Sequence, residues 1–342
     1  MKSSIYIFII LGITGIISCA PAKKESRSYP RLDPGAVFVK KDPLKGEYLQ
    51  YTLISPYSLF LTQYGLGYVV SKGENGILHM VDTVTAKEIA TCGRRGRGPG
   101  EFMGFICYNY DWHKSRLFAA DVYKQELWNF LFSEDSIRQC GYEKLGRDYK
   151  ALAALNDSVY VYLTFYPNQV FGMMTRRSKN LSSIPYRIIN REDIDYASFG
   201  FSCAMRLTPD KSKAVLIGST YASLQVYSIT GRNIELECDY PYFDHMYEIR
   251  DGQPYALDEN VNGGESSCVT DKNIYVLSYG KTVGDETPVT GSYILVFNMR
   301  GEYLKTYYID RRVYSIAVSQ DDKTLYATTV KDLDVYLMKF RL

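Results

Sequence analysis

The stretch Leu224-Gln225-Val226-Tyr227-Ser228 is one of six similar strand-forming elements in this 342-residue sequence. Each element is an apolar run that leads into a polar turn. The six begin at positions 77, 127, 170, 224, 294 and 335, which gives spacings of 50, 43, 54, 70 and 41 residues. One four-stranded blade of a β-propeller takes about 40–50 residues. The repeat therefore predicts six blades.

A second apolar run precedes most of these elements, often after a polar turn such as Asn156-Asp157 or Thr270-Asp271-Lys272. These runs are Arg116–Ala120, Ser158–Tyr162, Ala214–Ile217, Asn273–Leu277 and Thr324–Ala327. Short runs rich in Tyr, Val, Ile and Phe between turn residues are typical of antiparallel strands. We predict an all-β, six-bladed β-propeller of four-stranded antiparallel blades over residues 46–342. A two-sheet sandwich or two β domains are the alternatives, although a sandwich takes only about 100 residues.

The sixth element runs almost to Leu342, so no residues remain after it for a fourth strand of the last blade. An unpaired strand would leave an open sheet edge there. The apolar run Glu47–Ile54 stands before the first blade and has no other assignment. We predict that it completes the last blade and closes the ring.

The N-terminus carries an export signal. Lys2 precedes Ile5–Ile17, a nearly continuous apolar run that is shorter than the roughly 20 residues of a membrane span and suits a secretory signal peptide. Ile16-Ile17-Ser18-Cys19 resembles a bacterial lipobox. The resemblance implies cleavage after residue 18 and acylation of Cys19, and several acyl chains on one residue would anchor the protein firmly to a membrane. An ordinary signal peptide with a chance cysteine is the alternative. Residues 19–45, rich at first in Pro, Ser and charge, are predicted to be a flexible tether.

The segment Gly93-Arg94-Arg95-Gly96-Arg97-Gly98-Pro99-Gly100-Glu101-Phe102 is the most distinctive motif. It resembles the inter-blade loop of NHL-type propellers and, more closely, the TolB-like six-bladed propeller lipoproteins of Bacteroidota. The resemblance implies the fold but no activity, because most of those lipoproteins have none assigned. In that group an acidic run after the lipidated cysteine resembles a surface-export signal. Its absence here favours an outer-membrane anchor that faces the periplasm.

The same loop offers candidate ligand-binding residues. Arg94, Arg95 and Arg97 could grip a carboxylate, sulfate or phosphate, or the loop could be only a structural turn with Phe102 inserted between blades. A phosphate-binding Walker loop is excluded, because that motif ends in Gly-Lys-Ser/Thr and continues as a helix.

The wide spacing between the fourth and fifth elements indicates an insertion around Tyr240–Glu265. It contains Tyr242, His245, Tyr247 and Tyr255 together with several carboxylates, a composition that suits a carbohydrate or peptide surface on a loop. A longer blade connection with ordinary surface charge is the alternative.

No catalytic constellation stands out. The sequence has only three histidines and no GxSxG elbow, so a nucleophile triad is a poor interpretation. No cofactor and no metal ligands are predicted, although channel carboxylates and carbonyls could build a calcium site. A net charge of +2 does not suggest nucleic-acid binding. The remaining cysteines show no metal or CxxC spacing, and Cys92 with Cys107 is the first pair to test for a disulfide; these cysteines are Cys92, Cys107, Cys140, Cys203, Cys238 and Cys268.

Two functions agree with the sequence. The first is an envelope-tethered, non-catalytic binding or scaffold propeller that engages a protein, peptide or glycan. The alternative is a metal-assisted hydrolase or lyase, similar to a lactonase, working in the propeller channel.

Overall fold

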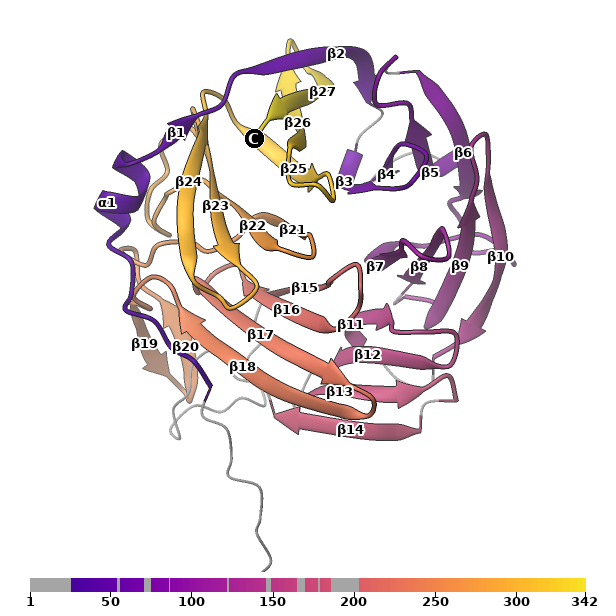
Figure 1. Cartoon of the computed structure of the whole chain (residues 1–342), viewed down its shortest axis with the longest axis horizontal. Helices are drawn as coiled ribbons and strands as arrows, with labels where there is room; N and C mark the ends of the chain where they lie inside the picture. Colours follow the sequence, from indigo (N-terminus) through magenta and orange to yellow (C-terminus); the bar gives the residue numbers. More distant parts are fainter. Residues whose placement is uncertain are drawn as a thin grey trace, which may run out of the picture.

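Six antiparallel sheets follow one another along the chain as blades around a central axis in the computed structural model (Figure 1). The structure describes residues 26–53, 56–70, 75–85, 87–121, 123–145, 149–164, 170–177, 179–185 and 203–342. The prediction of an all-β six-bladed propeller is confirmed. The alternatives of a sandwich or of two separate β domains are wrong.

The first three blades each have four strands, ordered from the innermost to the outermost. Blade 1 has β3 (Pro56–Leu61), β4 (Leu66–Val70), β5 (Asn75–Val81) and β6 (Glu88–Arg94). Blade 2 has β7 (Phe105–Asp111), β8 (Arg116–Asp121), β9 (Glu126–Phe132) and β10 (Ile137–Lys144). Blade 3 has β11 (Tyr149–Ala154), β12 (Val159–Thr164), β13 (Val170–Thr175) and β14 (Asn180–Pro185).

The last three blades continue the same order. Blade 4 has β15 (Cys203–Leu207), β16 (Lys213–Gly218), β17 (Ser223–Thr230) and β18 (Asn233–Pro241). Blade 5 has β21 (Ser266–Val269), β22 (Asn273–Ser278), β23 (Ser292–Asn298) and β24 (Tyr303–Ile309). Blade 6 has β25 (Val313–Val318), β26 (Thr324–Lys331), β27 (Asp334–Arg341) and β2 (Gly46–Leu53). The six repeated sequence elements are the third strands of the blades.

The ring closes as the sequence predicted. The N-terminal strand β2 pairs antiparallel with β27, with Glu47 opposite Lys339 and Leu53 opposite Val335. Gly46 permits this approach, because a Cβ atom there would lie only 2.3 Å from the ring of Phe340. Pairing the first and last segments in one sheet covers the edge of β27 and gives blade 6 its fourth strand.

Residues 27–45, which we call the strap, lie against the outside of the propeller (Figure 1). They include the short helix α1 (Pro34–Val39), whose N-cap is Asp33, and strand β1 (Asp42–Pro43), which pairs parallel with β24 and gives blade 5 a fifth strand. This packing differs from the flexible tether expected over residues 19–45. In the part of the chain that the structure describes, no helix is long and apolar enough to cross a membrane.

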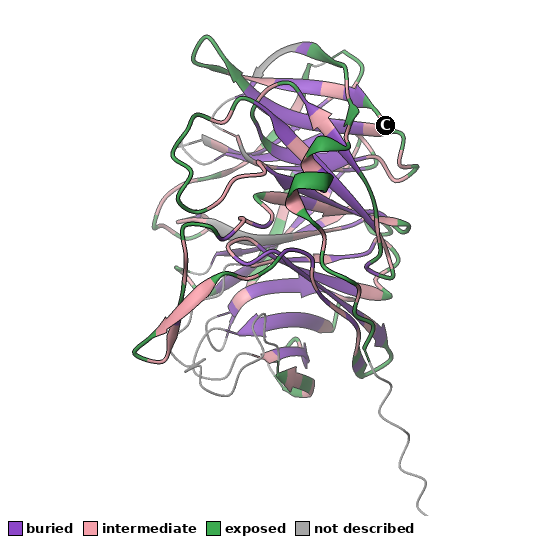
Figure 2. Ribbon diagram, turned by 90° about the vertical axis from the view of Figure 1, so that its left-hand side faces the viewer, coloured by how far each residue is buried: buried purple, intermediate pink, exposed green. Residues whose placement is uncertain are grey.

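Large side chains fill the spaces between neighbouring blades. Phe171 of blade 3, for example, packs on Tyr227 of blade 4 with ring centroids 4.7 Å apart, and both are buried. Buried strands make up the interior, whereas the helix and many connecting loops are exposed (Figure 2). Many of the 32 tyrosines serve this packing, as expected for a residue that suits half-buried pleated surfaces.

Candidate ligand site at the mouth of the channel

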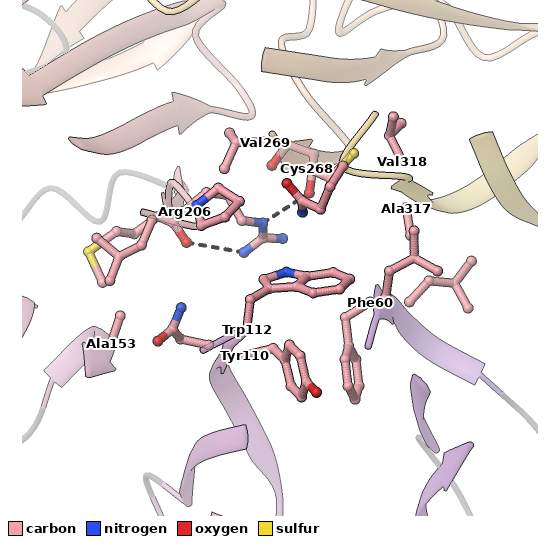
Figure 3. A pocket seen from close by; sticks show the side chains of 17 residues that line it. Phe60, Tyr110, Trp112, Ala153, Arg206, Cys268, Val269, Ala317 and Val318 are labelled. Carbon is pink, nitrogen blue, oxygen red and sulfur yellow. Dashed lines mark hydrogen bonds between the residues drawn. The ribbon is translucent and has the colours of Figure 1, made fainter. Parts of the chain in front are cut away.

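The six innermost strands surround a cavity of about 100 Å³ near their carboxyl ends (Figure 3). Every blade contributes to its lining, through Phe60, Tyr110, Ala153, Arg206, Cys268 and Ala317 respectively. A space of this size holds several waters or one end of a ligand. Because the carboxyl ends of these strands lead into the turns to the second strands, the cavity lies at the mouth of the channel on that face.

Arg206 supplies the positive charge of this cavity. It lies on the short strand β15, where its Nε donates to the carbonyl oxygen of Ser267 at 2.9 Å and its Nη1 donates to the carbonyl oxygen of Met205 at 3.2 Å. These two bonds fix the plane of the guanidinium (Figure 3). Among the described residues nothing accepts from Nη2, which leaves its donors for a guest. A guanidinium held in this way suits a carboxylate or phosphate.

Three oxygen atoms at the same cavity are buried and have no hydrogen-bond partner within the described part of the protein. They are Asn109 Oδ1, Ser267 Oγ and Gln320 Oε1. Ser267 itself is only 4% exposed. A buried acceptor without a donor costs about 1–3 kcal/mol, so such atoms indicate an ordered water or a ligand.

Aromatic side chains form one wall of the cavity. Trp112 packs edge-on against Tyr110 at 5.6 Å, and Phe60 lies 6.0 Å from Tyr110. Burial raises the pKa of the Tyr110 hydroxyl to about 12, so it stays neutral at physiological pH. Burial also raises the pKa of the Cys268 thiol to about 12, although the Arg206 guanidinium opposes this shift. A thiol that stays protonated is a poor nucleophile.

Contacts between the turns hold the mouth in shape. Lys211 reaches from blade 4 to the Asp111 carboxylate of blade 2 at 2.5 Å and to the carbonyl oxygen of Leu155 in blade 3 at 3.0 Å. The further contacts between turns are Gln63 with Trp112, Lys114 with Asp157, Asp210 with Asp271, and Thr270 with Asp322. Between the first and last blades, Leu59 N donates to Ser315 Oγ at 3.0 Å. The lining residues therefore stand on a continuous, cross-linked rim.

A family model for TolB-like six-bladed propellers matches residues 50–321. The chain belongs to the TolB-like six-bladed propeller family. A Bacteroides fragilis protein assigned as exported is similar in structure, with 13% identity, a TM-score of 0.54, and coverage of 92% of this chain and 98% of that one. A member of the DUF4221 family from Bacteroides vulgatus has 12% identity, a TM-score of 0.56, and coverage of 89% and 99%. No curated protein matches the sequence. At such identities the structural likeness shows the fold alone.

The arginine loop of this TolB-like propeller, residues 93–102, is held in place by contacts with other residues of the chain. Arg94 Nε lies 3.5 Å from Glu101 Oε1, and Arg95 donates to the carbonyl oxygens of Met103 and Val70. Arg97 is exposed. The structure thus places Arg94 and Arg97 at the surface and uses Arg95 to join the loop to blade 1. The predicted anion site remains a prediction.

The expected position of the Phe102 side chain, between two blades, is confirmed. Its side chain is 1% exposed and packs on Trp128 and Phe130 of blade 2, with ring centroids 4.5 Å and 5.5 Å away. Gly93 has a φ of +84° and lies over Ile77 of blade 1, where a Cβ atom would come within 2.5 Å of the isoleucine side chain. The motif therefore forms a compact turn that seats an aromatic ring.

The predicted insertion contains a separate hairpin, β19 (Tyr247–Arg250) with β20 (Gln253–Ala256). It lies between blades 4 and 5, among the connections from outer to inner strands. The arginine loop is another such connection, so both belong to the face opposite the cavity. The candidate residues of the arginine loop and those of the insertion therefore do not lie beside Arg206.

The four candidate residues of the insertion have different environments. Tyr242 is fully buried and its pKa is raised by that burial. His245 and Tyr247 are half-buried beside Tyr221, whose ring lies 5.4 Å from the histidine ring. Tyr255 is 46% exposed, with the Arg250 guanidinium 5.4 Å from its ring. Of these four residues, only Tyr255 is exposed.

His245 should make stability depend on pH. Burial lowers its pKa below the ordinary value, and its Nε2 lies 3.3 Å from the Ala222 carbonyl oxygen. As pH falls, the unfolded chain therefore binds a proton at His245 before the folded protein does. The stability that neutral His245 contributes is fully present above the unfolded pKa and is lost as pH falls towards the folded pKa. Between about pH 7.5 and 5.5 the urea midpoint of His245→Gln should fall less than that of the wild type. Equal falls would contradict this assignment.

The described residues assemble no metal site, and among them Cys92, one of the pair chosen as the first to test for a disulfide, forms no disulfide. They contain no group of three or more His, Cys, Asp or Glu side chains that could hold a metal ion. Among them, the residues that line the channel cavity include no carboxylate. Within the described residues, no disulfide forms at Cys92, Cys140, Cys203, Cys238 or Cys268. The side chain of Cys107 and the predicted lipidation site Cys19 lie outside the described residues.

Sequence reasoning missed Arg206 and Trp112. Each carried a weak signal: Arg206 is the one charged residue in the strand Cys-Ala-Met-Arg-Leu, and Trp112 is one of two tryptophans in the chain. Their convergence depends on the ring, because 94 positions separate them. Sequence spacing alone could not bring them together.

Proposed function

We propose that this propeller is an envelope-tethered binding protein whose site is the mouth of the channel. The observation that carries this proposal is the meeting of the Arg206 guanidinium with the unpartnered oxygens of Asn109, Ser267 and Gln320 in one cavity. A half-buried cation beside acceptors that have no donor within the described part of the protein is matched by a ligand that brings an anion and hydrogen-bond donors together.

The ligand class follows from that match. Arg206 would receive a carboxylate, while Asn109, Ser267 and Gln320 would receive N–H or O–H groups on neighbouring atoms. Amino acids, the ends of peptides and acidic sugars all have this chemistry. Because the cavity is small, about 100 Å³, the occupant is a small molecule or the terminal group of a peptide or glycan, with the aromatic wall of Trp112 and Tyr110 against its apolar part.

The cell envelope is the proposed location. The export signal and the lipobox at Cys19 support a lipid anchor in the outer membrane, facing the periplasm. The Bacteroides fragilis protein of similar fold is assigned as exported, which supports export of this chain as well. Mass spectrometry of the purified full-length protein would test the anchor: acyl groups on Cys19 are expected, and a free N-terminal amine on an unmodified Cys19 would contradict it.

A metal-assisted hydrolase or lyase has less support. The described channel residues bring no carboxylates together, so binding is the function that the site supports better. The β19–β20 hairpin, with exposed Tyr255 in β20 and exposed Met246 just before β19, is a secondary surface for a protein, peptide or glycan.

Substituting Arg206 should weaken ligand binding. Isothermal titration of the mature chain with amino acids, dipeptides and uronic acids is expected to identify ligands, and Arg206→Met should weaken them about 10- to 100-fold, since hydrogen bonds to a charged group contribute about 1.5–3 kcal/mol. The control is Arg177→Met, which removes an exposed arginine from the outer turn of blade 3. Equal affinities in the wild type and Arg206→Met, with both folded by circular dichroism, would contradict the site.

A further inference from the structure

The strap joins the N-terminal segment to the outer edge of blade 4. Arg27 forms a parallel bridge with Cys238 of β18: its N–H donates to the carbonyl oxygen of Glu237 at 2.8 Å, and its own carbonyl oxygen accepts from Asp239 at 3.0 Å. Further along, Leu32 N donates to the carbonyl oxygen of Tyr242 at 2.8 Å. The strap therefore begins with a single parallel bridge to the outermost strand of this blade.

Side chains hold the same stretch in place. The Tyr29 ring packs edge-on against Tyr240 at 5.4 Å, and the Tyr240 hydroxyl donates to the carbonyl oxygen of Pro30 at 2.8 Å. The Phe38 ring lies 4.7 Å from Tyr293 of blade 5, and Val37 is buried. Such a combination of main-chain bonds and buried apolar groups keeps the strap on the propeller.

Docking of the strap leaves a short chain between Cys19 and the folded domain. From Cys19 to Arg27 there are eight residue steps, which reach at most about 26–29 Å when fully extended. A free tether over residues 19–45 would reach roughly three times as far. A domain of this length is about 50 Å across, so the eight steps cannot carry the anchor around to the opposite edge.

We propose that the strap holds the propeller edge-on to a phospholipid bilayer, with the outer edge of blade 4 next to the lipid. This inference rests on the lipid anchor in the proposed function. The ring axis then lies roughly parallel to the membrane plane. Both faces of the ring, including the channel mouth with Arg206, open sideways into the aqueous compartment rather than towards the lipid.

The sequence next to the anchor agrees with this orientation. The stretch Ala20–Ser26 carries Lys23 and Lys24 against the single acid Glu25, and Arg27 follows directly. Basic residues close to a membrane surface are attracted to anionic headgroups. The chain that leaves blade 4 is therefore suited to lie near lipid.

Energy transfer to labelled lipid tests the orientation. The full-length lipidated protein is reconstituted into phospholipid vesicles that contain an acceptor dye on the headgroup, and a donor dye is attached through an unnatural amino acid at Arg232 or at Val84. Both positions are exposed in the turn between the third and fourth strands of a blade, Arg232 in blade 4 and Val84 in blade 1. Blades 4 and 1 are opposite in a six-bladed ring (Figure 1), so the two sites are matched.

Transfer from Arg232 is expected to be at least about twofold higher than from Val84, because the two turns lie on opposite edges of a ring about 50 Å across. Insertion of about 20 Gly and Ser residues after Ser26 lengthens the chain without altering the strap and should make the two signals nearly equal. Equal transfer in the unmodified protein, with acylation of Cys19 confirmed by mass spectrometry, would overturn the orientation alone. Absence of the acyl groups would overturn both the orientation and the anchor.

Discussion

Replacing Lys211 with methionine is expected to lower the free energy of unfolding by about 3–5 kcal/mol, the usual effect of leaving a buried charge without its partner. Asp111 is 1% exposed at its side chain and Lys211 is 13% exposed. The ammonium group also donates to the Leu155 carbonyl oxygen, so its loss removes one donor from each of two groups in different blades. Urea unfolding followed by fluorescence measures the change.

Lys114 provides the matched control. It lies in the neighbouring turn and pairs with Asp157 at 2.5 Å, but the two side chains are 40% and 58% exposed. Lys114→Met should therefore cost less than about 1 kcal/mol. Adding Asp111→Asn to Lys211→Met should restore part of the stability, because the uncompensated charge is removed. If the Lys211 and Lys114 variants were equally stable, the buried ion pair would not be what holds the rim together.

Replacing Phe102 with alanine is expected to cost about 3–5 kcal/mol, the range for deleting a buried aromatic side chain. This ring closes the arginine loop over Trp128 and Phe130 and is 1% exposed. Its removal would leave a cavity between blades 1 and 2 that the two rigid sheets cannot collapse. The midpoint of urea unfolding should fall accordingly.

Tyr142 is the corresponding control, because its ring also lies 4.5 Å from Trp128 but is 47% exposed. Tyr142→Ala should cost about 1 kcal/mol, since much less apolar surface is lost from the interior. A loss for Phe102→Ala as small as that for Tyr142→Ala would show that the motif does not stabilise the blade interface.

The blade repeat was readable from the sequence because each third strand, such as β17 or β23, must be apolar to pack between two neighbouring blades. Closure by β2 was also predictable, because the apolar run Glu47–Ile54 stands before the first blade with no place in the repeat. The strap was not predictable. Its apolar anchors are Tyr29 and a short run that contains Val37 and Phe38. Neither belongs to the blade repeat, and their burial depends on blades 4 and 5.

The channel site was beyond sequence reasoning for a similar reason. A pattern of strands specifies which residues face inward, but not which inward residues of six different blades meet at one depth. Arg206, Asn109 and Gln320 come from blades 4, 2 and 6. The sequence instead pointed to Arg94, Arg97 and Tyr255, because unusual local composition is visible without the fold.

Trp112 offers the most direct measurement of the central claim, that the mouth of the channel binds a carboxylate ligand. Replacing Trp128 with phenylalanine leaves Trp112, which lines the cavity, as the only tryptophan. Titration of this variant with amino acids, dipeptides and uronic acids is predicted to give a saturable change in Trp112 fluorescence that Arg206→Met weakens about tenfold or more. A signal that does not change with any of them, or that saturates at the same concentrations without Arg206, would contradict the account.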